Sequence, residues 1–185
     1  MLHHLDQHLF DEPTIHRRLD EMAREITEDY RGKELTAVAV MTGSIIFAAD
    51  LLRRMNLPLK LECVSASSYH GGTASSGEVR FGDLPDLSGR HVLILDDILD
   101  TGLTLHALCE RISQQSPPLS VEVCVLLRKR KVRGPSIDAR YAGFDIGDEF
   151  VVGYGLDYQG EYRNLPFVAT LRPEIVEATA GEPIA

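Results

Sequence analysis

Residues 92–105 read VLILDDILDTGLTL, and the expected fold follows from this stretch. The apolar run His91–Leu95 predicts a buried strand that ends in two adjacent carboxylates, Asp96 and Asp97. A short turn rich in Thr and Gly follows, and the pattern beyond it predicts a helix over residues 103–112. In parallel α/β sheets, ligands bind at the carboxyl ends of the strands. The stretch therefore predicts an α/β fold with a ligand site where this strand meets the helix.

Strands and helices alternate on both sides of this stretch. The pattern predicts helices over residues 13–31 and 44–55 and strands over residues 36–41, 59–67 and 120–127. This order favours a parallel-sheet core with flanking crossover helices. Beyond about residue 135, short apolar runs are mixed with Gly, Pro, Asp and aromatic residues, which suggests short strands and loops over the edge of the sheet.

The composition is that of one ordinary globular domain. The 185 residues include 44% apolar and 25% charged residues. The net charge of −9 repels the phosphate backbone of nucleic acids, so broad nucleic-acid binding is a poor hypothesis. No apolar run approaches the roughly 20 residues that span a bilayer, and the N-terminus lacks the basic start and long apolar stretch of a secretion signal. We therefore expect a cytoplasmic protein.

Three cysteines, Cys63, Cys109 and Cys124, are widely spaced and form no CxxC pair. Their pattern predicts neither a zinc site nor a disulfide framework. We expect small buried apolar residues in a reducing compartment. Cys109 lacks an evident activating partner, so a nucleophilic role has little support.

Three carboxylates within five residues, Asp96, Asp97 and Asp100, require a chemical reason. Asp96 and Asp97 suit hydrogen bonds from the vicinal hydroxyls of a ribose, directly or through a divalent cation. Asp100 lies at the mouth of the turn, where it is placed to accept a proton from a substrate.

The turn itself suits a phosphate group. The start of the helix offers free N–H groups and the favourable end of the helix dipole. Gly102 lets the backbone approach a ligand closely, and Thr101 and Thr104 add hydroxyl donors. The alternative is that the acids are only N-cap and turn residues, since Asp and Thr are favoured there. That role explains one acid but hardly three beside a Thr-Gly-x-Thr turn.

VLILDDILDTGLTL resembles the phosphoribosyl pyrophosphate motif of the type I phosphoribosyltransferases: an apolar strand, two acids, two apolar positions and then D-T-G-x-T. Four further segments resemble the hypoxanthine-guanine members of that family, in the same order. They are VMTGSIIFAADL, SSY followed by a Gly/Ser loop, LLRKR, and FVVGYGLDYQGEYRNLPFV. The similarity runs from about residue 36 to about residue 170.

The resemblance implies a phosphoribosyl pyrophosphate site. Its residues are Asp96 and Asp97 at the ribose hydroxyls, Thr101, Gly102, Leu103 and Thr104 around the 5′-phosphate, and Thr42, Gly43 and Arg163 at pyrophosphate. Leu103 takes part through its backbone. Many family members carry Lys or another long polar residue where Thr42 stands. The resemblance implies that this loop meets pyrophosphate largely through backbone N–H groups, so we expect binding to survive the difference. The resemblance also implies a cis peptide bond between Met41 and Thr42.

A purine site is implied beside it, with Asp100 as the general base near N7. Lys129 matches a lysine that contacts the 6-oxo group, which selects against the amino group of adenine. Phe150 matches the aromatic residue that stacks on the base, and Val151 contacts the base through its backbone. Asp157 matches a magnesium-ligand position near pyrophosphate and base, and Asp96 and Asp97 are further candidate ligands of Mg²⁺. Two alternatives remain: Lys129 belongs to a solvated basic strand end, and Phe150 is a core aromatic.

Residues 68–78 read SYHGGTASSGE and offer almost nothing that anchors to a core. By the resemblance, Ser68 and Tyr69 begin a flexible lid over the reacting centre. A plain surface hairpin tip is the alternative. The resemblance further implies one domain over residues 1–185, with a core of about 33–130. A small base-binding hood is then expected mainly from residues 131–170, together with the N-terminal segment.

The implied function is transfer of phosphoribosyl from phosphoribosyl pyrophosphate to N9 of hypoxanthine or guanine, with Mg²⁺, in purine salvage. The products are IMP or GMP and pyrophosphate. A homodimer or homotetramer is expected, with no nucleic-acid or membrane partner. Alternatives are a transferase that prefers xanthine, a regulator that senses phosphoribosyl pyrophosphate without turnover, and a flavodoxin-like binding module. The negative charge and the presence of Asp100 speak against the regulator, and the loop acids speak against the binding module.

Overall fold

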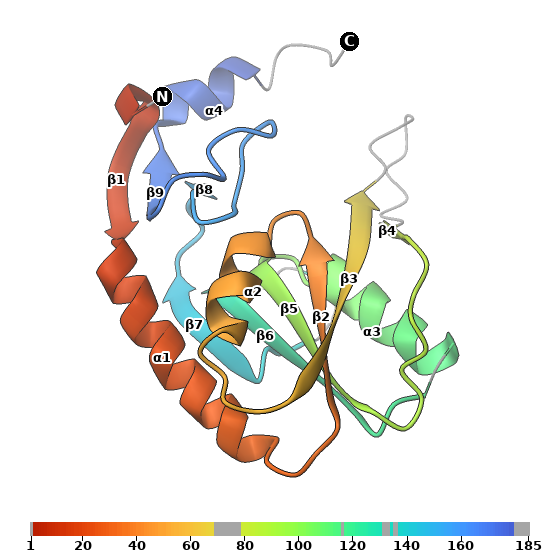
Figure 1. Ribbon diagram of the computed structural model, residues 1–185. Helices are drawn as coiled ribbons and strands as arrows, with labels where there is room; N and C mark the ends of the chain where they lie inside the picture. Colours follow the sequence, from red (N-terminus) through yellow and green to blue (C-terminus); the bar gives the residue numbers. More distant parts are fainter. Residues whose placement is uncertain (1, 69–78, 116, 131–133, 135–136, 180–185) are drawn as a thin grey trace.

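The computed structural model describes residues 2–68, 79–115, 117–130, 134 and 137–179 (Figure 1). The elements in chain order are η1 (Leu2–His4), β1 (Leu5–Phe10), α1 (Glu12–Asp29), β2 (Leu35–Met41), α2 (Ile45–Leu52), β3 (Leu59–Ser68), β4 (Val79–Phe81), β5 (His91–Leu99), α3 (Leu103–Gln115), β6 (Ser120–Lys129), β7 (Tyr141–Ile146), β8 (Val151–Val152), β9 (Val168–Leu171) and α4 (Pro173–Thr179).

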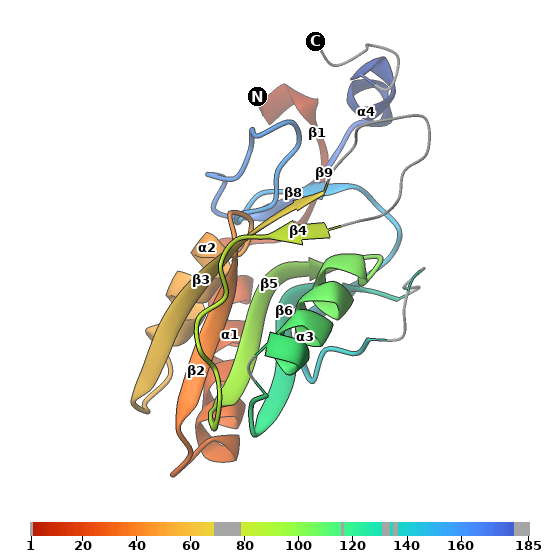
Figure 2. The same ribbon diagram turned by 90° about the vertical axis from the view of Figure 1, so that its right-hand side faces the viewer.

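A six-stranded sheet in the order β4-β3-β2-β5-β6-β7 forms the body of the molecule. Strands β3, β2, β5, β6 and β7 pair in parallel, and β4 pairs antiparallel with β3. Helices α1 and α2 cover one face and α3 covers the other (Figure 2). This arrangement confirms the predicted α/β class with a parallel-sheet core.

The alternation of side chains along the central strands divides the core into two layers. In β5, Leu93 and Leu95 pack with α1 and α2, whereas Val92 and Ile94 pack with α3. Both faces are covered, so the first part of the strand, Val92–Leu95, reads in sequence as an apolar run without alternation. This burial on both sides is why the central strands were predictable.

Helix α1 runs from Glu12 to Asp29, where the sequence predicts a helix over residues 13–31. The carboxylate of Asp11 accepts a hydrogen bond from the backbone N–H of Thr14 at 2.9 Å, which caps the first turn. The stripe that recurs at three- and four-residue steps is buried against the sheet; its members are Ile15, Leu19, Met22, Ala23 and Ile26.

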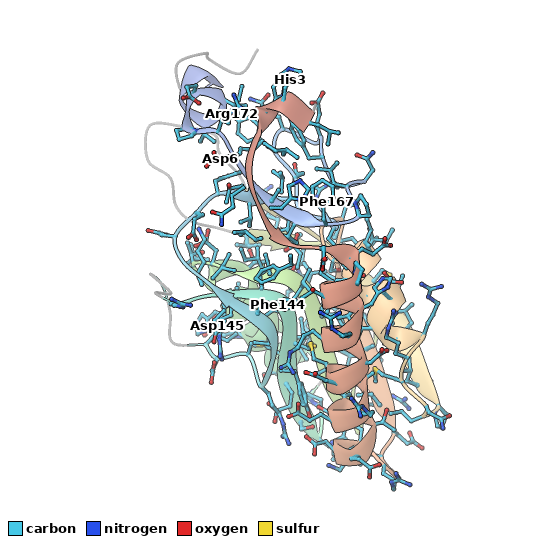
Figure 3. All side chains as sticks on the ribbon, turned by 90° about the vertical axis from the view of Figure 1, so that its left-hand side faces the viewer. His3, Asp6, Phe144, Asp145, Phe167 and Arg172 are labelled. Atoms are coloured by element: carbon cyan, nitrogen blue, oxygen red, sulfur yellow. The ribbon has the colours of Figure 1, made fainter. Side chains whose placement is uncertain are left out.

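A second, smaller sheet joins the two ends of the chain, in the order β1-β9-β8. Strand β9 pairs antiparallel with both neighbours. Arg172 and Phe167 lie beside β1 (Figure 3), where Arg172 donates to the carbonyl of Leu5 at 3.2 Å and Phe167 stacks on His8. Phe144 of β7 stacks on Phe10 at the end of β1, with 4.0 Å between ring centroids.

Several boundaries differ from the sequence prediction. Strand β5 continues to Leu99, so Asp96 and Asp97 lie inside the strand and not beyond its end; Ile98 still pairs with Leu127 of β6. Helix α2 ends at Leu52, not at residue 55. Ser44 occupies the N-cap position of α2, but its hydroxyl donates to the carbonyl of Val40 at 2.6 Å and does not cap the helix.

The cysteine prediction was partly wrong. Cys124 is buried, as expected, but Cys63 is exposed on β3, near the edge of the sheet. Burial raises the pKa of the Cys109 thiol to about 11, which agrees with a packing role and not a nucleophilic one. Among the described residues, no helix has the length and apolar character needed to span a membrane.

Candidate active site

The turn after β5 brings the predicted phosphate-binding residues to the carboxyl end of the sheet. The backbone passes through Gly102 with φ of +77° and enters α3 at Leu103. The backbone N–H of Leu103 points to the hydroxyl of Thr101 at 3.4 Å. Thr101, Gly102 and Thr104 at this helix start line a pocket of about 370 Å³.

This first pocket collects residues from four separate segments of the chain. Its lining is Val40, Met41, Thr42, Gly43, Ala66, Asp96, Asp97, Ile98, Asp100, Thr101, Gly102, Thr104, Leu105, Asp157 and Arg163. Every expected phosphoribosyl pyrophosphate residue is present except Leu103, whose side chain is 44% exposed at the start of α3. The peptide bond between Met41 and Thr42 is cis, as the resemblance implies.

Asp96 and Asp97 are adjacent carboxylates in a largely buried position. Burial and the charge of Asp97 together raise the pKa of Asp96 well above its ordinary value. Burial also raises the pKa of Asp97, while the Ile98 backbone N–H and the Arg163 charge oppose that rise. The pair therefore favours any ligand that brings hydroxyl donors or positive charge.

Gly43 lies directly against this carboxylate pair. A Cβ atom at position 43 would stand 1.9 Å from Oδ2 of Asp97, closer than any real contact. A side chain at position 43 would therefore displace the carboxylate of Asp97, and the loop between β2 and α2 lines the pocket at this point.

A second, smaller pocket of about 160 Å³ adjoins the first. It is lined by Asp97, Ile98, Asp100, Lys129, Glu149, Phe150, Val151, Leu156 and Asp157. The pockets share Asp97, Ile98, Asp100 and Asp157, so they are two parts of one cleft. All predicted purine-site residues line this second part.

Lys129 points into the cleft and not into solvent. Its Nζ lies 3.1 Å from Oδ2 of Asp100 and 3.7 Å from Oδ1 of Asp148, and its side chain is only 12% exposed. Arg128, the preceding residue, pairs instead with Asp145 at 2.8 Å. Successive residues of a strand face opposite ways, which explains why only one of these two cations enters the cleft. The alternative of a solvated basic strand end is wrong for Lys129.

Phe150 is 44% exposed and lines the cleft, so the alternative of a core aromatic is also wrong. Its ring meets that of Tyr158 edge-on, with 5.4 Å between centroids. Val151, the next residue, is buried in β8.

Arg163 and Asp157 form an ion pair at the rim of the first pocket. Nη2 of Arg163 lies 2.7 Å from Oδ1 of Asp157, and Nη1 donates to the carbonyl of Gly155 at 2.6 Å. Oδ2 of Asp157 accepts from the backbone N–H of Gly160 at 2.7 Å. Both side chains are therefore held in place before any ligand arrives.

Sequence reasoning missed some members of the cleft. Glu149 and Leu156 line the second pocket, and Asp148 faces Lys129. No sequence motif identifies these residues; the only signal is that they lie close to Phe150 in the sequence. Of the expected lid residues, Ser68 ends β3 and pairs with Val79 of β4, whereas Tyr69 lies outside the described residues.

The acids of the cleft do not form a ready-made metal cage. In the part of the chain that the structure describes, no three His, Cys, Asp or Glu side chains converge as they do around a bound ion. Asp157, one of the expected ligands, is already paired with Arg163. Any cation here requires oxygen donors from a ligand in addition to those of the protein.

Comparison with known proteins gives a consistent result. A family model described as a phosphoribosyl transferase domain matches residues 7–159. The hypoxanthine-guanine phosphoribosyltransferase of Staphylococcus aureus is 43% identical over 92% of this chain and 96% of its own length. The enzyme of the same name from Mycobacterium avium is 44% identical over 88% of this chain and 84% of its own length.

Solved structures agree with these relatives. A hypoxanthine phosphoribosyltransferase from Staphylococcus aureus has a TM-score of 0.89 at 43% identity, covering 95% of this chain and 96% of that one. A hypoxanthine-guanine phosphoribosyltransferase from Bacillus anthracis, with a HEPES molecule in its active site, has a TM-score of 0.84 at 38% identity. It covers 91% of this chain and 99% of that one.

Proposed function

Because the chain belongs to the phosphoribosyltransferase family, we propose that it transfers phosphoribosyl from phosphoribosyl pyrophosphate to N9 of a 6-oxopurine. The base is hypoxanthine, guanine or both, and the products are IMP or GMP and pyrophosphate. The reaction belongs to purine salvage, and the chain acts in the cytoplasm.

The observation that carries this proposal is the cleft with two unlike halves. One half is polar, with a helix start and buried carboxylates; the other has an aromatic ring and a single ammonium group. Asp100 lines both halves. A sugar phosphate in the first half and a planar base in the second would meet beside this residue.

In the polar half, each group has a task that suits its chemistry. Asp96 and Asp97 accept hydrogen bonds from the ribose hydroxyls. The turn residues hold the 5′-phosphate through backbone N–H groups and hydroxyls; they are Thr101, Gly102, Leu103 and Thr104. Pyrophosphate meets the backbone of Thr42 and Gly43 and the guanidinium of Arg163.

In the base half, Lys129 donates to the 6-oxo group and Phe150 stacks on the ring. Val151 contacts the base through its backbone, and Asp157 lies between base and pyrophosphate. The ammonium group of Lys129 can donate to the 6-oxo group of hypoxanthine or guanine. The 6-amino group of adenine is itself a donor, so the site favours 6-oxopurines. The contact between Lys129 and Asp100 also links base recognition to the proton acceptor.

The chemical step is a displacement at the anomeric carbon. The bond from this carbon to the pyrophosphate oxygen breaks, and its electron pair leaves with pyrophosphate. N9 forms the new bond, while Asp100 takes or buffers the proton at N7 as positive charge builds on the sugar and base.

The oxygen donors of the cleft fit Mg²⁺, which binds proteins through one or two carboxylates together with substrate phosphates and water. Asp96, Asp97 and Asp157 are the protein groups that would hold it. When bound, the ion neutralises the charge of the leaving pyrophosphate. This charge matters here because the cleft itself is rich in carboxylates.

The domain arrangement supports the same division of labour. We take residues 1–185 as one domain, with a core of about 33–130 that binds the sugar phosphate. The small sheet β1-β9-β8 and the segments beside it form a hood over the base, because β8 carries Val151 and follows Phe150 directly. Ser68 and Tyr69 would begin a lid.

We also propose that the protein is a homo-oligomer without nucleic-acid or membrane partners. Ile45 on α2 and Leu61 on β3 are exposed apolar side chains that would pack in contacts between subunits. Light scattering of the purified protein measures its mass directly, and a monomer would contradict this part of the proposal.

The central test is turnover with each of hypoxanthine, guanine, xanthine and adenine, supplied separately with phosphoribosyl pyrophosphate and magnesium. We expect IMP or GMP, lost on addition of a chelator and in Asp100→Ala. Asp83→Ala, at an exposed carboxylate outside both pockets, should keep its activity. Activity only with adenine would overturn the role of Lys129, and a preference for xanthine would change the substrate assignment. Binding of phosphoribosyl pyrophosphate without turnover of any base would favour the sensor.

A further inference from the structure

A hydrogen bond between two residues that line neither pocket lies behind the cleft. The hydroxyl of Tyr154, just beyond β8, donates to Oδ2 of Asp50 on α2 at 2.5 Å. Tyr154 is 2% exposed and packs in the core layer that contains Phe47 and Leu51 of α2. Its φ of +52° is a left-handed conformation that residues with side chains rarely adopt, so its contacts must hold it there.

Asp50 is a strong acceptor for this bond. Arg53 pairs with its Oδ1, Arg54 lies 3.8 Å from the same oxygen, and His16 of α1 lies 3.7 Å from Oδ2. Burial raises the pKa of Asp50, but the hydrogen bonds from Tyr154 and Arg53 outweigh it, so the pKa is lowered overall. The carboxylate is therefore ionised at neutral pH, and the bond from Tyr154 is charge-assisted.

Tyr154 starts a segment whose backbone leads directly to the cleft. Its N–H donates to the carbonyl of Leu165 at 2.9 Å, and the N–H of Gly155 donates to the carbonyl of Arg163 at 3.0 Å. The guanidinium of Arg163 returns to the carbonyl of Gly155. The position of Arg163, and with it that of Asp157, thus follows the position of residues 154 and 155.

The same segment presses against the loop between β2 and α2. A Cβ atom at Gly155 would stand 2.1 Å from the carbonyl oxygen of Gly43. Gly43 is in turn in contact with Asp97 on its other side. The loop is therefore held between β5 and the segment after β8, and a small shift of that segment changes the position of the loop.

We propose that Asp50 and Tyr154 are positioning residues for the pyrophosphate end of the substrate. They hold the segment Tyr154–Arg163 against α2, so that the backbone of Gly43 and the guanidinium of Arg163 form one binding surface. Lys129 lies on β6, outside this segment, and Phe150 precedes it. The segment reaches the base half only through Leu156, Asp157 and the ring of Tyr158, so we expect the base half to depend on this bond less than the pyrophosphate end does. The inference rests on the proposed function, which assigns that end of the cleft to pyrophosphate.

The test is Tyr154→Phe, which removes one hydroxyl and keeps the ring. We expect the KM for phosphoribosyl pyrophosphate to rise by about tenfold, while the KM for hypoxanthine stays within about twofold. A residue that only supports folding would lower the active fraction, and so kcat, without separating the two KM values.

The chain offers a matched control in Tyr141 of β7. Tyr141 is also 2% exposed, and its hydroxyl donates at 2.7 Å to Asp29, which likewise pairs with an arginine, Arg140. Neither Tyr141 nor Asp29 lines the cleft. Tyr141→Phe removes a hydrogen bond of the same kind, from a tyrosine hydroxyl to an aspartate, and should leave both KM values unchanged.

An unchanged KM for phosphoribosyl pyrophosphate in Tyr154→Phe would overturn the inference, as would an equal rise in Tyr141→Phe. If Tyr154→Phe does not fold, Asp50→Asn is measured against the same criterion, since it keeps an oxygen acceptor but removes the charge. Calorimetric binding of pyrophosphate with magnesium separates this inference from the proposed function. Should the unchanged protein turn over no base, a roughly tenfold weaker affinity in Tyr154→Phe than in Tyr141→Phe still supports it, and equal affinities refute it.

Discussion

At the scale of single residues, the cleft contains a pair of buried carboxylates that folding alone would not favour. Asp96 is 8% exposed beside a second carboxylate, and the pKa values of both are raised by burial. Two carboxylates crowded in this way disfavour the folded state, because each loses water and repels the other. Their presence is explained by a ligand and not by packing.

We therefore expect Asp96→Asn to make the ligand-free protein more stable while it impairs the reaction. The amide keeps the oxygen that accepts the N–H of Asp97 at 3.0 Å and removes one buried charge. The free energy of unfolding in urea, with a chelator present, should rise by about 1 kcal/mol. Asp83→Asn, at an exposed acid, should change it by less than about 0.5 kcal/mol. A loss of stability in Asp96→Asn would show that Asp96 is held by favourable contacts.

Two neighbouring cations of β6 offer a second comparison. Lys129 faces the cleft, whereas Arg128 pairs with Asp145 away from it. Lys129→Gln should lower kcat/KM for hypoxanthine by about 10²-fold, because the 6-oxo group loses its charged donor. Arg128→Gln should leave kcat/KM within about twofold. Similar losses in both variants would mean that the strand end acts only through its overall charge.

At the scale of elements, burial explains most of what could be predicted, although β3 was also predicted and is largely exposed. Strands β2, β5 and β6 were predicted because both faces of their central residues are covered, so each contains a continuous apolar run: Ala37–Met41, Val92–Leu95 and Val123–Leu127. Strand β1 (LDQHLF) and strand β7 (YAGFDI) lie at sheet edges, with polar residues among the apolar ones, and were not identified individually. Burial on one side leaves a weaker pattern.

The candidate site divides in the same way. Asp96, Asp97 and Asp100 were found from the residues themselves, because the acids are adjacent in sequence to a strand end. Asp157 and Arg163 were expected only by family resemblance, since a turn far along the chain brings them to the cleft. The pair Asp50 and Tyr154 gave no signal, because its meaning depends on a contact across 104 positions of sequence.

The contact between Asp29 of α1 and Tyr141 of β7 should make the free energy of unfolding depend on pH. The hydrogen bond from Tyr141, together with Arg140, lowers the pKa of Asp29 below its ordinary value. A lowered carboxyl pKa adds stability above the unfolded-state value, and this stability is lost as the pH falls through the folded-state value. Asp29→Asn should therefore be less stable than the unchanged protein at pH 7, with the difference narrowing below about pH 4. Chemical unfolding at a series of pH values measures it; a constant difference would contradict the assignment.

At the scale of the whole molecule, the two ends of the chain meet in one small sheet. Strand β1 pairs with β9, and β9 pairs with β8, which follows Phe150. The strand pairing of the larger sheet does not involve β1, because its order runs from β4 to β7 without it; β1 meets that sheet through the stacking of Phe10 on Phe144. The two halves of the cleft are therefore supported by different parts of the chain.

Removal of residues 1–10 should thus affect base binding more than binding of phosphoribosyl pyrophosphate. Without β1, β9 loses one of its two partners, and the small sheet beside Phe150 and Val151 loses its support. We expect the KM for hypoxanthine to rise several-fold and the KM for phosphoribosyl pyrophosphate to change less. The second KM serves as the internal control, and equal effects on both would argue that the small sheet supports the entire cleft.

The meeting of the chain ends also has a consequence for synthesis on the ribosome. The parallel sheet is complete once β7 has emerged, so the 5′-phosphate turn can take shape while the C-terminal part is still being translated. Strand β1 is made first, but its partner β9 is the last strand in chain order, so β1 stays unpaired until β9 has been made. A nascent chain stalled after β7 lacks the segment with Asp157 and Arg163, so we expect it to be inactive. Activity should appear only after β9 has left the ribosome.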